Sequence, residues 1–265
     1  MQADNCPITS LEPLRNQPVR IIKVNNSLIT DLSPLQGKPM RTLHIEFTRV
    51  SNLAAISGMP LYSLAAYGVP VPDSVYETIT AIPLGFLTLD ITDPKARAAV
   101  RAMPYVTYVN YHVRPHTLAF IDLLDSVSSP AQAQRILMKQ AFRYGSAAYY
   151  AVPLVMTCKE AQQFCARYGA SIASPETFDE FRAIYKYIEG LCAEFTSYHI
   201  GMRTNPITGE KGYLEGVTPL DRVWASPFEK ERSQKTGLAK FYGAAHRYRM
   251  GITAEEKACF VMEWE

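Results

Sequence analysis

The sequence predicts two domains: a solenoid of short parallel strands with irregular or short helical returns, followed by an α+β domain. Three observations lead to this fold class. A proline recurs about every 21 residues through residues 1–112. The period stops in residues 113–145, which we expect to form a connector and capping helix. Residues 146–265 then follow the order strand, helix, helix, strand, long loop and final strand, which is typical of an α+β domain.

The repeat of the first domain is marked by prolines spaced 21, 21, 23 and 21 residues apart: Pro18, Pro39, Pro60, Pro83 and Pro104. Each precedes an apolar-x-x-apolar-x-apolar pattern, such as Met40, Leu43 and Ile45. One such turn cannot bury its apolar side alone, whereas stacked turns form a continuous core, so this period predicts a solenoid. We also expect hydroxyl groups to bind free backbone groups at the bends, from Ser27, Thr48 and Thr92.

The turns follow the form I-T-D-L-S-P-L-x-G-x-P-L-x-x-L-x-I, most clearly over residues 29–45. This pattern resembles a bacterial leucine-rich repeat array over roughly residues 8–112. The likeness weakens after an insertion at 67–80 and at Asn110, where an apolar residue is expected. The resemblance implies protein binding on the strand face that points away from the core. The residues expected on that face are Ile21, Lys23, Thr42, His44, Ser63, Ala65, Phe86, Thr88, Thr107 and Val109.

This predicted face carries no stripe of charge and no aromatic cluster in the sequence, so a structural spacer remains an alternative to a binding face. Residues 1–7 are too short for the polar cap that a solenoid end needs. They also lack the charged start and apolar stretch of a signal peptide. We therefore expect the chain to be the C-terminal piece of a longer protein.

The middle stretch is expected to contain one helix, because Ser128-Ser129-Pro130 is typical of a helix start and apolar residues follow at helical spacing over 131–144. We expect this helix to cap the repeats and join them to the second domain. His112 and His116 have a spacing that metal ligands can use, but no Cys or Glu nearby completes a set. We predict no metal site there.

The second domain begins with a strand at 149–152, followed by a helix over 158–168 with Thr157 as its cap and Gly169 as its end. Ser174-Pro175-Glu176 is expected to open a second helix, whose inward residues are Phe178, Phe181, Ile184, Tyr185 and Ile188. Residues 198–202 and 259–264 are predicted strands. A loop-rich region, 203–250, separates them.

Three ordered segments carry a second resemblance: 157–176, the Tyr-His-Ile-Gly-Met run at 198–202, and the Phe-Val-Met-Glu-Trp run at 260–264. Together they resemble a C-type lectin-like domain, which implies two helices beside small sheets and a long loop region that holds the ligand. Both triplets that bind calcium in sugar-binding members are missing. Arg249-Met250-Gly251 stands near one of their places and offers no carboxylate. Calcium binding and calcium-dependent sugar recognition are therefore not expected.

The five cysteines do not match the disulfide pattern of that family. The resemblance aligns Cys165 with the family's first-helix cysteine, but Met262 stands at the partner position. Cys158 lies about 10.5 Å from Cys165 along the same helix, too far for a disulfide. A bridge from Cys192 or Cys259 to this helix stays open. Unpaired cysteines favour the cytoplasm, and the cell surface is the alternative if the chain is a fragment.

Composition and motifs exclude several functions. Lys and Arg number 27 against 25 Asp and Glu, without a basic run, so nucleic-acid binding is not expected. No apolar run approaches the roughly 18 residues of a membrane span. The sequence shows no phosphate-binding glycine loop, no Gly-x-Ser-x-Gly elbow and no His-Glu-x-x-His or Cys-x-x-Cys motif.

We therefore expect a non-enzymatic recognition module without a cofactor, which binds a protein or another ligand. A structural scaffold and a carbohydrate-binding lectin are the alternatives. Aromatic and arginine side chains are enriched at protein interfaces. The candidate ligand-binding residues in the loop region are Tyr213, Trp224, Phe228, Tyr242, His246, Arg247, Tyr248 and Arg249.

Overall fold

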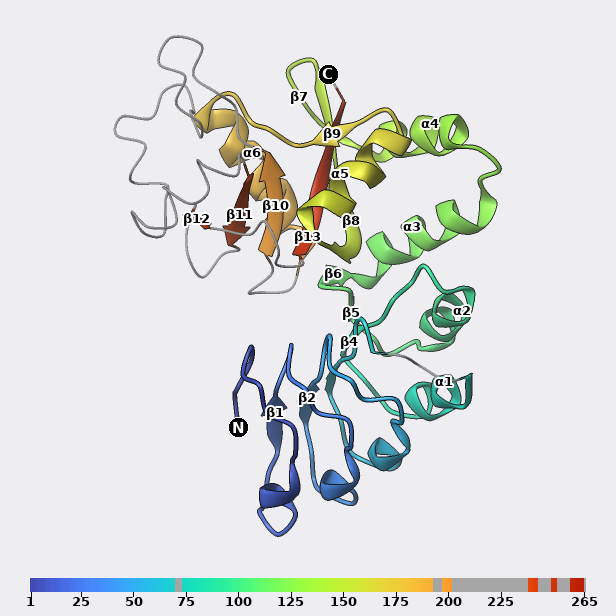
Figure 1. Cartoon of the computed structure of the whole chain (residues 1–265). Helices are drawn as coiled ribbons and strands as arrows, with labels where there is room; N and C mark the ends of the chain where they lie inside the picture. Colours follow the sequence, from blue (N-terminus) through green and yellow to red (C-terminus); the bar gives the residue numbers. More distant parts are fainter. Residues whose placement is uncertain (70–72, 193–196, 202–237, 243–248, 252–257, 265) are drawn as a thin grey trace. The chain divides into compact units, whose positions relative to one another are not determined.

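A computed structural model describes residues 1–69, 73–192, 197–201, 238–242, 249–251 and 258–264 (Figure 1). The chain divides into two compact units, Met1–Leu118 and Ala119–Glu265. The domain bounds drawn from the sequence remain a prediction.

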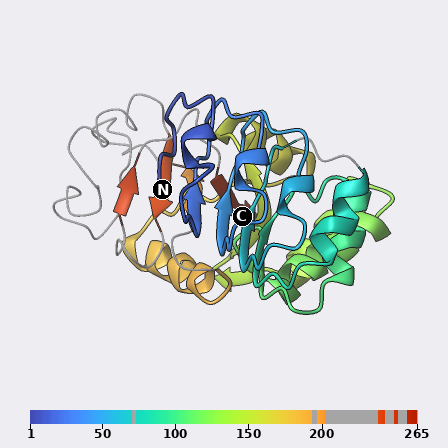
Figure 2. The same ribbon diagram turned by 90° about the horizontal axis from the view of Figure 1, so that it is seen from below.

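The first unit contains a six-stranded, mostly parallel sheet. Strands β1 (Ile21–Lys23), β2 (Thr42–His44), β3 (Ser63–Ala65), β4 (Phe86–Thr88) and β5 (Tyr108–Val109) lie side by side in sequence order (Figure 2). Strand β6 (His112–Val113) pairs antiparallel with β5. Leu43 pairs with Ile22 on one side and Leu64 on the other, and all three are fully buried. Strands β1 to β4 therefore occupy the positions predicted from the proline period. The prediction was wrong by one residue at β5: Val109, expected to face outward, pairs with the buried Leu87 and is itself fully buried, whereas Tyr108 pairs with Phe86.

The segments that return between these strands are short 3-10 helices first and α-helices later: η1 (Glu12–Leu14), η2 (Ser33–Leu35), η3 (Ala54–Ile56), α1 (Asp73–Thr80) and α2 (Pro94–Ala102). Asp93 caps α2, since its side chain accepts a hydrogen bond from the Lys95 backbone N–H. The insertion at 67–80 thus includes α1. A longer return replaces the 3-10 turn where the period lengthens.

The bends beside the strands repeat at the same period as the prolines. A positive φ recurs every 21 residues at Asn5, Asn26, Phe47 and Gly68, and again at Asn110. The first of these bends lies in residues 1–5, where Gln2 forms a parallel bridge with Lys23. The Asn26 side-chain amide donates a hydrogen bond of 3.0 Å to Asn5 Oδ1. Residues 1–5 therefore continue the ladder of the parallel sheet.

The polar side chains at the bends differ in the hydrogen bonds that they form. Thr48 donates to the Ile45 carbonyl at 2.7 Å, as predicted. Thr92 donates instead to Asp90 Oδ1 at 2.6 Å. The Ser27 hydroxyl is buried without a hydrogen-bond partner in the structure, so its expected role is not met. Asn110 is fully buried, and its Oδ1 accepts the Leu89 backbone N–H at 2.9 Å, which explains a polar residue where the repeat predicts an apolar one.

Two helices form most of the middle stretch. Helix α3 (Arg114–Ser126) crosses the boundary between the units, so residues 118–126, interpreted from the sequence only as an apolar run, are helical. Helix α4 (Pro130–Gln140) begins as predicted, with Ser129 accepting the Gln132 N–H at 3.3 Å. It ends before the predicted Tyr144, because residues 142–144 form strand β7 (Phe142–Tyr144) on the sheet of the second unit.

The second unit is built on a seven-stranded mixed sheet. It contains β7, β8 (Ala147–Met156), β9 (Ser171–Ile172), β10 (Ser197–Gly201), β11 (Leu238–Tyr242), β12 (Arg249–Gly251) and β13 (Ala258–Trp264). The last strand, β13, lies inside the sheet, antiparallel to β8 and β9 and parallel to β10. The predicted loop region 203–250 thus contains β11 and the start of β12, which pair with each other.

Two helices accompany this sheet, and both begin with a capping box. Thr157 and Glu160 cap α5 (Cys158–Arg167), which ends before Gly169 at a φ of +63°, as predicted. Helix α6 (Phe178–Glu189) begins after Thr177 rather than at Pro175, because Thr177 and Glu180 form its capping box. Phe181, Ile184, Tyr185 and Ile188 are buried, as expected.

All five cysteines are free thiols, so the structure contains neither of the bridges left open by the sequence. No helix in the described part of the chain is long and apolar enough to cross a membrane. The described residues also contain no group of three or more His, Cys, Asp or Glu side chains arranged to hold a metal ion.

Candidate binding sites

The first candidate site is the outward face of the parallel sheet. Side chains alternate along a strand, so burial of Ile22, Leu43 and Leu64 places their neighbours on the opposite face. Of the predicted face residues, Lys23, Thr42, His44 and Phe86 are half-buried, whereas Ser63, Ala65, Thr88 and Val109 are buried. Ile21 is the most exposed of the apolar ones at 46%.

An aromatic cluster lies on this face, although the sequence predicted none there. His44 stacks on Phe86 with ring centroids 6.1 Å apart, and Phe86 meets the edge of Tyr111 at 5.5 Å. The His44 Nε2 atom also forms a hydrogen bond of 2.9 Å with Ser63 Oγ. The prediction was wrong because Tyr111 lies in the bend after β5, outside the strand positions from which the face was inferred.

Charge on this face is controlled by burial. Burial, together with the nearby charge of Lys23, lowers the pKa of His44 to about 4, so its imidazole is neutral near pH 7. Burial raises the pKa of Glu46, although hydrogen bonds from Tyr111 and Thr88, each 2.7 Å long, act against that shift. Glu46 follows β2 by two residues and was not singled out from the sequence. Residues two apart in an extended segment lie on the same face, so the spacing of Glu46 from His44 is the signal that could have identified it.

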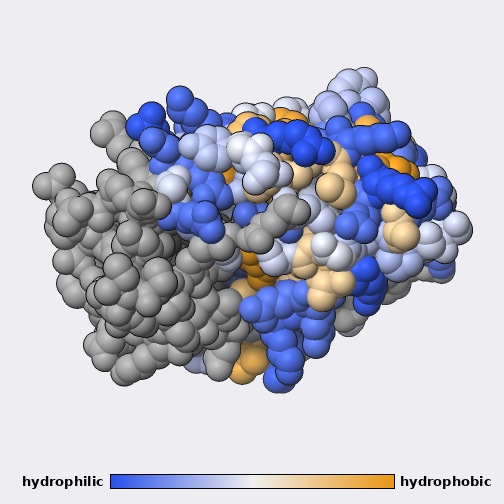
Figure 3. Space-filling model, turned by 90° about the horizontal axis from the view of Figure 1, so that it is seen from above, coloured by the Kyte–Doolittle hydropathy of each residue, from blue (hydrophilic) through white to orange (hydrophobic). Residues whose placement is uncertain are grey.

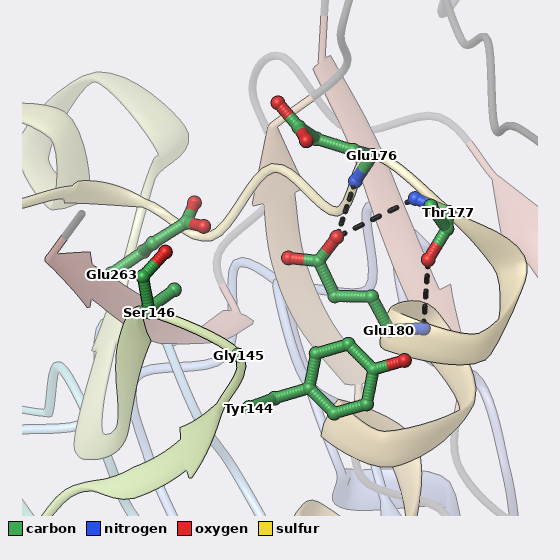
Figure 4. Close-up of a pocket in the computed structure, with 8 residues that line it drawn as sticks. Tyr144, Gly145, Ser146, Glu176, Thr177, Glu180 and Glu263 are labelled. Atoms are coloured by element: carbon green, nitrogen blue, oxygen red, sulfur yellow. Dashed lines mark hydrogen bonds between the residues drawn. The ribbon is translucent and has the colours of Figure 1, made fainter.

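The second candidate site is an acidic cavity of about 410 Å³ in the second unit (Figure 4). Its lining comes from the β7–β8 turn, the segment before α6, the first turn of α6 and the end of β13. The residues are Tyr144, Gly145, Ser146, Ala147, Glu176, Thr177, Glu180 and Glu263. Three carboxylates and no Lys, Arg or His line it, so this cavity favours a positively charged or hydrogen-bond-donating group.

Two of these carboxylates meet at one buried phenol. The Tyr149 hydroxyl on β8 hydrogen-bonds with Glu180 Oε1 and lies 3.0 Å from Glu263 Oε1. Glu180 Oε2 accepts the Glu176 N–H at 2.7 Å and the Thr177 N–H at 3.4 Å (Figure 4). Burial, followed by the two carboxylates, raises the pKa of Tyr149 far above its ordinary value, so the phenol keeps its proton.

Sequence reasoning missed this cavity, although two of its carboxylates carry a signal. The Thr177-x-x-Glu180 spacing is that of a capping box. Glu263 is a charged residue inside an otherwise apolar strand, and it is only 2% exposed. The approach of Glu180 to Glu263 depends on long-range pairing that the sequence pattern does not contain.

Most of the loop residues predicted to bind ligand lie outside the described part of the chain: Tyr213, Trp224, Phe228, His246, Arg247 and Tyr248. The backbones of Tyr242 and Arg249 are described, and these residues stand opposite each other on β11 and β12. Their role in binding remains a prediction.

No family model matches the chain, and no curated protein matches it. Several solved C-type lectin structures are similar to part of it. They include the carbohydrate-recognition domain of human scavenger receptor C-type lectin, with 18% identity over 47% of this chain and 95% of the other and a TM-score of 0.34.

The Ca²⁺-independent C-type lectin SPL-2 from Saxidomus purpuratus has 16% identity over 47% of this chain and 90% of its own, with a TM-score of 0.36. The C-type lectin CEL-I from Cucumaria echinata has 16% identity over 46% of this chain and 93% of its own, also with a TM-score of 0.36. Likenesses of this degree assign no ligand to the chain.

Proposed function

We propose that the chain is a non-enzymatic recognition module, in which a leucine-rich-repeat solenoid precedes a degenerate C-type lectin-like domain. It binds a protein partner, or another ligand that does not require calcium, through the outward face of the parallel sheet, the loop region of the second unit, or both. The observation that carries this proposal is the half-buried cluster of His44, Phe86 and Tyr111 on the outward face.

The repeat interpretation is supported by the agreement between three periods. Prolines, strands and positive-φ bends recur at 21 to 23 residues in the first unit. The lectin-like interpretation is supported by the position of its three sequence segments. They fall on α5 with β9, on β10 and on β13, and β13 pairs with both strands.

A binding rather than catalytic role is supported by the cysteines. Burial raises the pKa of Cys158 to about 11 and of Cys165 to about 12. A nucleophilic cysteine works as the thiolate, and a raised pKa disfavours that form at neutral pH. These thiols behave as small buried apolar groups.

The face seen in Figure 3 and the net charge both favour recognition by local contacts. On the face shown in Figure 3, apolar residues are scattered among hydrophilic ones and form no broad continuous patch. With a net charge of only +2, long-range attraction to an oppositely charged partner is weak. Shape and aromatic contacts are then the basis of affinity.

The test is a binding measurement with the full chain and a partner first identified by cross-linking. Phe86→Ala removes the central ring of the cluster, and we expect at least a tenfold loss of affinity, as for an interface anchor. Tyr105→Ala is the matched control, because Tyr105 is 77% exposed and its backbone precedes β5. Equal affinity for both variants would move the proposal to the loop region, where Trp224→Ala and Arg247→Ala test it.

A glycan array with and without calcium separates this proposal from a lectin function. Specific binding that requires calcium would contradict it. A structural spacer is the second candidate, and the ladder that continues from residues 1–5 through β5 favours it. The spacer is supported if neither the Phe86 variant nor the loop variants change any binding.

A further inference from the structure

Three exposed residues stand side by side where the first strands of the parallel sheet begin. Arg20, Arg41 and Tyr62 each precede a strand, β1, β2 and β3, by one residue, and all three are exposed. Their backbones are hydrogen-bonded in this order, with the Arg41 N–H donating to the Arg20 carbonyl at 2.8 Å and the Tyr62 N–H to the Arg41 carbonyl at 2.9 Å. The strands follow the same order in Figure 2. We call these three residues the arginine–tyrosine row, which borders the outward face.

The two arginines of the row are neighbours of like charge. Adjacent strands are about 4.8 Å apart, so the two side chains extend from backbones at that spacing. Like charges on adjacent strands destabilise a sheet. Neither guanidinium group forms a hydrogen bond or an ion pair with a residue that the structure describes. An anion that binds both groups would remove the repulsion between them.

The acidic groups at the opposite ends of β1 and β2 are already hydrogen-bonded within the sheet. Asp4 Oδ1 accepts the Asn25 N–H at 2.9 Å. Glu46 is buried and accepts hydrogen bonds from the hydroxyl groups of Thr88 and Tyr111. These acids therefore connect neighbouring turns, whereas the arginines at the strand starts have no such role. The strand starts are complementary in charge to an acidic ligand.

Tyr62 is kept in its exposed position by a glycine. It is 59% exposed, and its ring lies against Gly85, the residue that precedes β4. A Cβ atom at Gly85 would lie 2.2 Å from Tyr62 Cε2, which is closer than two non-bonded carbon atoms can approach. Gly85 has no positive φ that would itself favour glycine. The missing side chain thus makes room for the ring, and Phe86 of the aromatic cluster follows directly.

We propose that the arginine–tyrosine row binds an acidic segment of a protein partner, with its carboxylates on Arg20 and Arg41 and an apolar group against the Tyr62 ring. This inference rests on the proposed function, because it names the partner chemistry at one edge of the same face. Arginine can bind a carboxylate through paired hydrogen bonds, and arginine and tyrosine are enriched among the residues that dominate binding energy. Such contacts act at short range, so they agree with the small net charge of the chain.

An acidic peptide fits this row better than a nucleic acid does. A nucleic acid presents a long line of phosphates and is bound by an extended basic surface. The row contains only two neighbouring cations, and the next positions of the same ladder are Gly85 and Thr107, which carry no charge. A short segment with a few carboxylates matches a site of that size.

Fluorescence anisotropy of the full chain with defined probes tests the proposal. The probes are a labelled peptide of alternating Glu and Tyr, its Lys and Tyr counterpart, and a DNA oligonucleotide. We expect the Glu–Tyr peptide to bind, and the double variant Arg20→Gln, Arg41→Gln to bind it about tenfold more weakly. The matched control is Arg49→Gln, Arg135→Gln, which removes the same charge at two other exposed positions and should leave the affinity within about twofold.

Several results would overturn the acidic segment as the ligand. They are absence of wild-type binding to the Glu–Tyr peptide up to about 1 mM, equally tight binding of the Lys–Tyr peptide, and equal losses in the two double variants. Tighter binding of the oligonucleotide that depends on Arg20 and Arg41 would assign the row to nucleic acid instead.

A double-mutant cycle tests the position of the Tyr62 ring. Gly85→Ala forces the ring to move, and an exposed ring can turn into solvent, so the fold should remain intact. We expect Gly85→Ala and Tyr62→Ala each to weaken binding of the Glu–Tyr peptide about threefold, and Gly85→Ala to have no further effect when Tyr62 is already alanine. Additive losses would refute the role of the ring.

The same variants separate this inference from the proposed function. With the partner identified by cross-linking, a loss of affinity in Phe86→Ala but not in Arg20→Gln, Arg41→Gln would overturn the acidic segment and leave the proposed function intact. Losses in both variants support both proposals. Unchanged affinity in both would remove the outward face and its edge as a binding surface.

Discussion

The two units use opposite strategies to join their strands. In the parallel part of the first sheet, each of β1 to β5 pairs with a strand that lies 21 to 23 residues away, as Leu43 does with Ile22 and Leu64. In the second unit the last strand of the chain, β13, pairs with β8 across more than 100 residues, as Trp264 does with Ala148. The first arrangement is a sum of similar local contacts. The second depends on β13, which pairs with three of the other six strands, so a destabilising substitution should affect neighbouring strands differently in the two units.

The largest expected effect is at Phe260 on β13. This side chain is fully buried and meets Phe164 of α5 edge-to-face at 5.5 Å. Phe260→Ala should cost about 3–5 kcal/mol of unfolding free energy, because a cavity opens where strand and helix meet. Hydrogen exchange should show lost protection on β8, β10 and β13 together. Loss confined to β13 would contradict the central role of this strand.

The next effect compares two equivalent leucines of the first unit. Leu35 in η2 is fully buried, whereas Leu14 in η1 is half-buried. Leu35→Ala should cost about 2–5 kcal/mol, and Leu14→Ala clearly less, because less apolar surface is lost from the core. Urea unfolding of the two variants provides the comparison. Equal losses would show that the first turn is as tightly packed as the second.

A pH effect should follow from His112 in the first unit. This side chain is fully buried, and burial together with His116 lowers its pKa to about 3. An unfolded histidine titrates near 6.5, so the unfolded state binds more protons between those values and stability falls as the solution is acidified. The contribution is at most about 1.4 kcal/mol per pH unit.

Urea unfolding at several pH values between about 7 and 4 measures this contribution. His112→Asn should reduce the acid slope, and Glu189→Gln serves as a control in the second unit. An acid slope that is unchanged in His112→Asn would contradict this contribution.

The smallest effect concerns the two helix caps of the second unit. Thr157→Ala should cost about 1 kcal/mol, because it leaves the Glu160 N–H at the start of α5 without its side-chain acceptor. Thr177→Ala should cost more, since Glu180 also accepts a hydrogen bond from the Tyr149 hydroxyl of β8. Thermal unfolding of both variants measures the difference. Equal losses would indicate that the cap and the Tyr149–Glu180 hydrogen bond act independently.

Local spacing was sufficient to predict much of this molecule. The proline period located the strands at Ile21–Lys23, Thr42–His44, Ser63–Ala65 and Phe86–Thr88. It could do so because each turn of a repeat must bury one apolar side against its neighbours. Thr157 and Gly169 marked the ends of α5 for a similar reason, since caps satisfy backbone groups within a few residues. These features are encoded by neighbours along the chain.

The tertiary structure determined which residues from distant segments come into contact. Tyr111 reaches Phe86 and Glu46 only because a bend turns back beside β4 and β2, 65 residues from Glu46 in the sequence. Glu180 meets Glu263 only because β13 enters the sheet beside β8, where Tyr149 lies between them. A sequence pattern records the burial and period of each element, whereas the meeting of two buried charges depends on which strands pair. The sequence by itself therefore determined the strands of the repeat and the capped helices, and strand pairing determined the candidate sites.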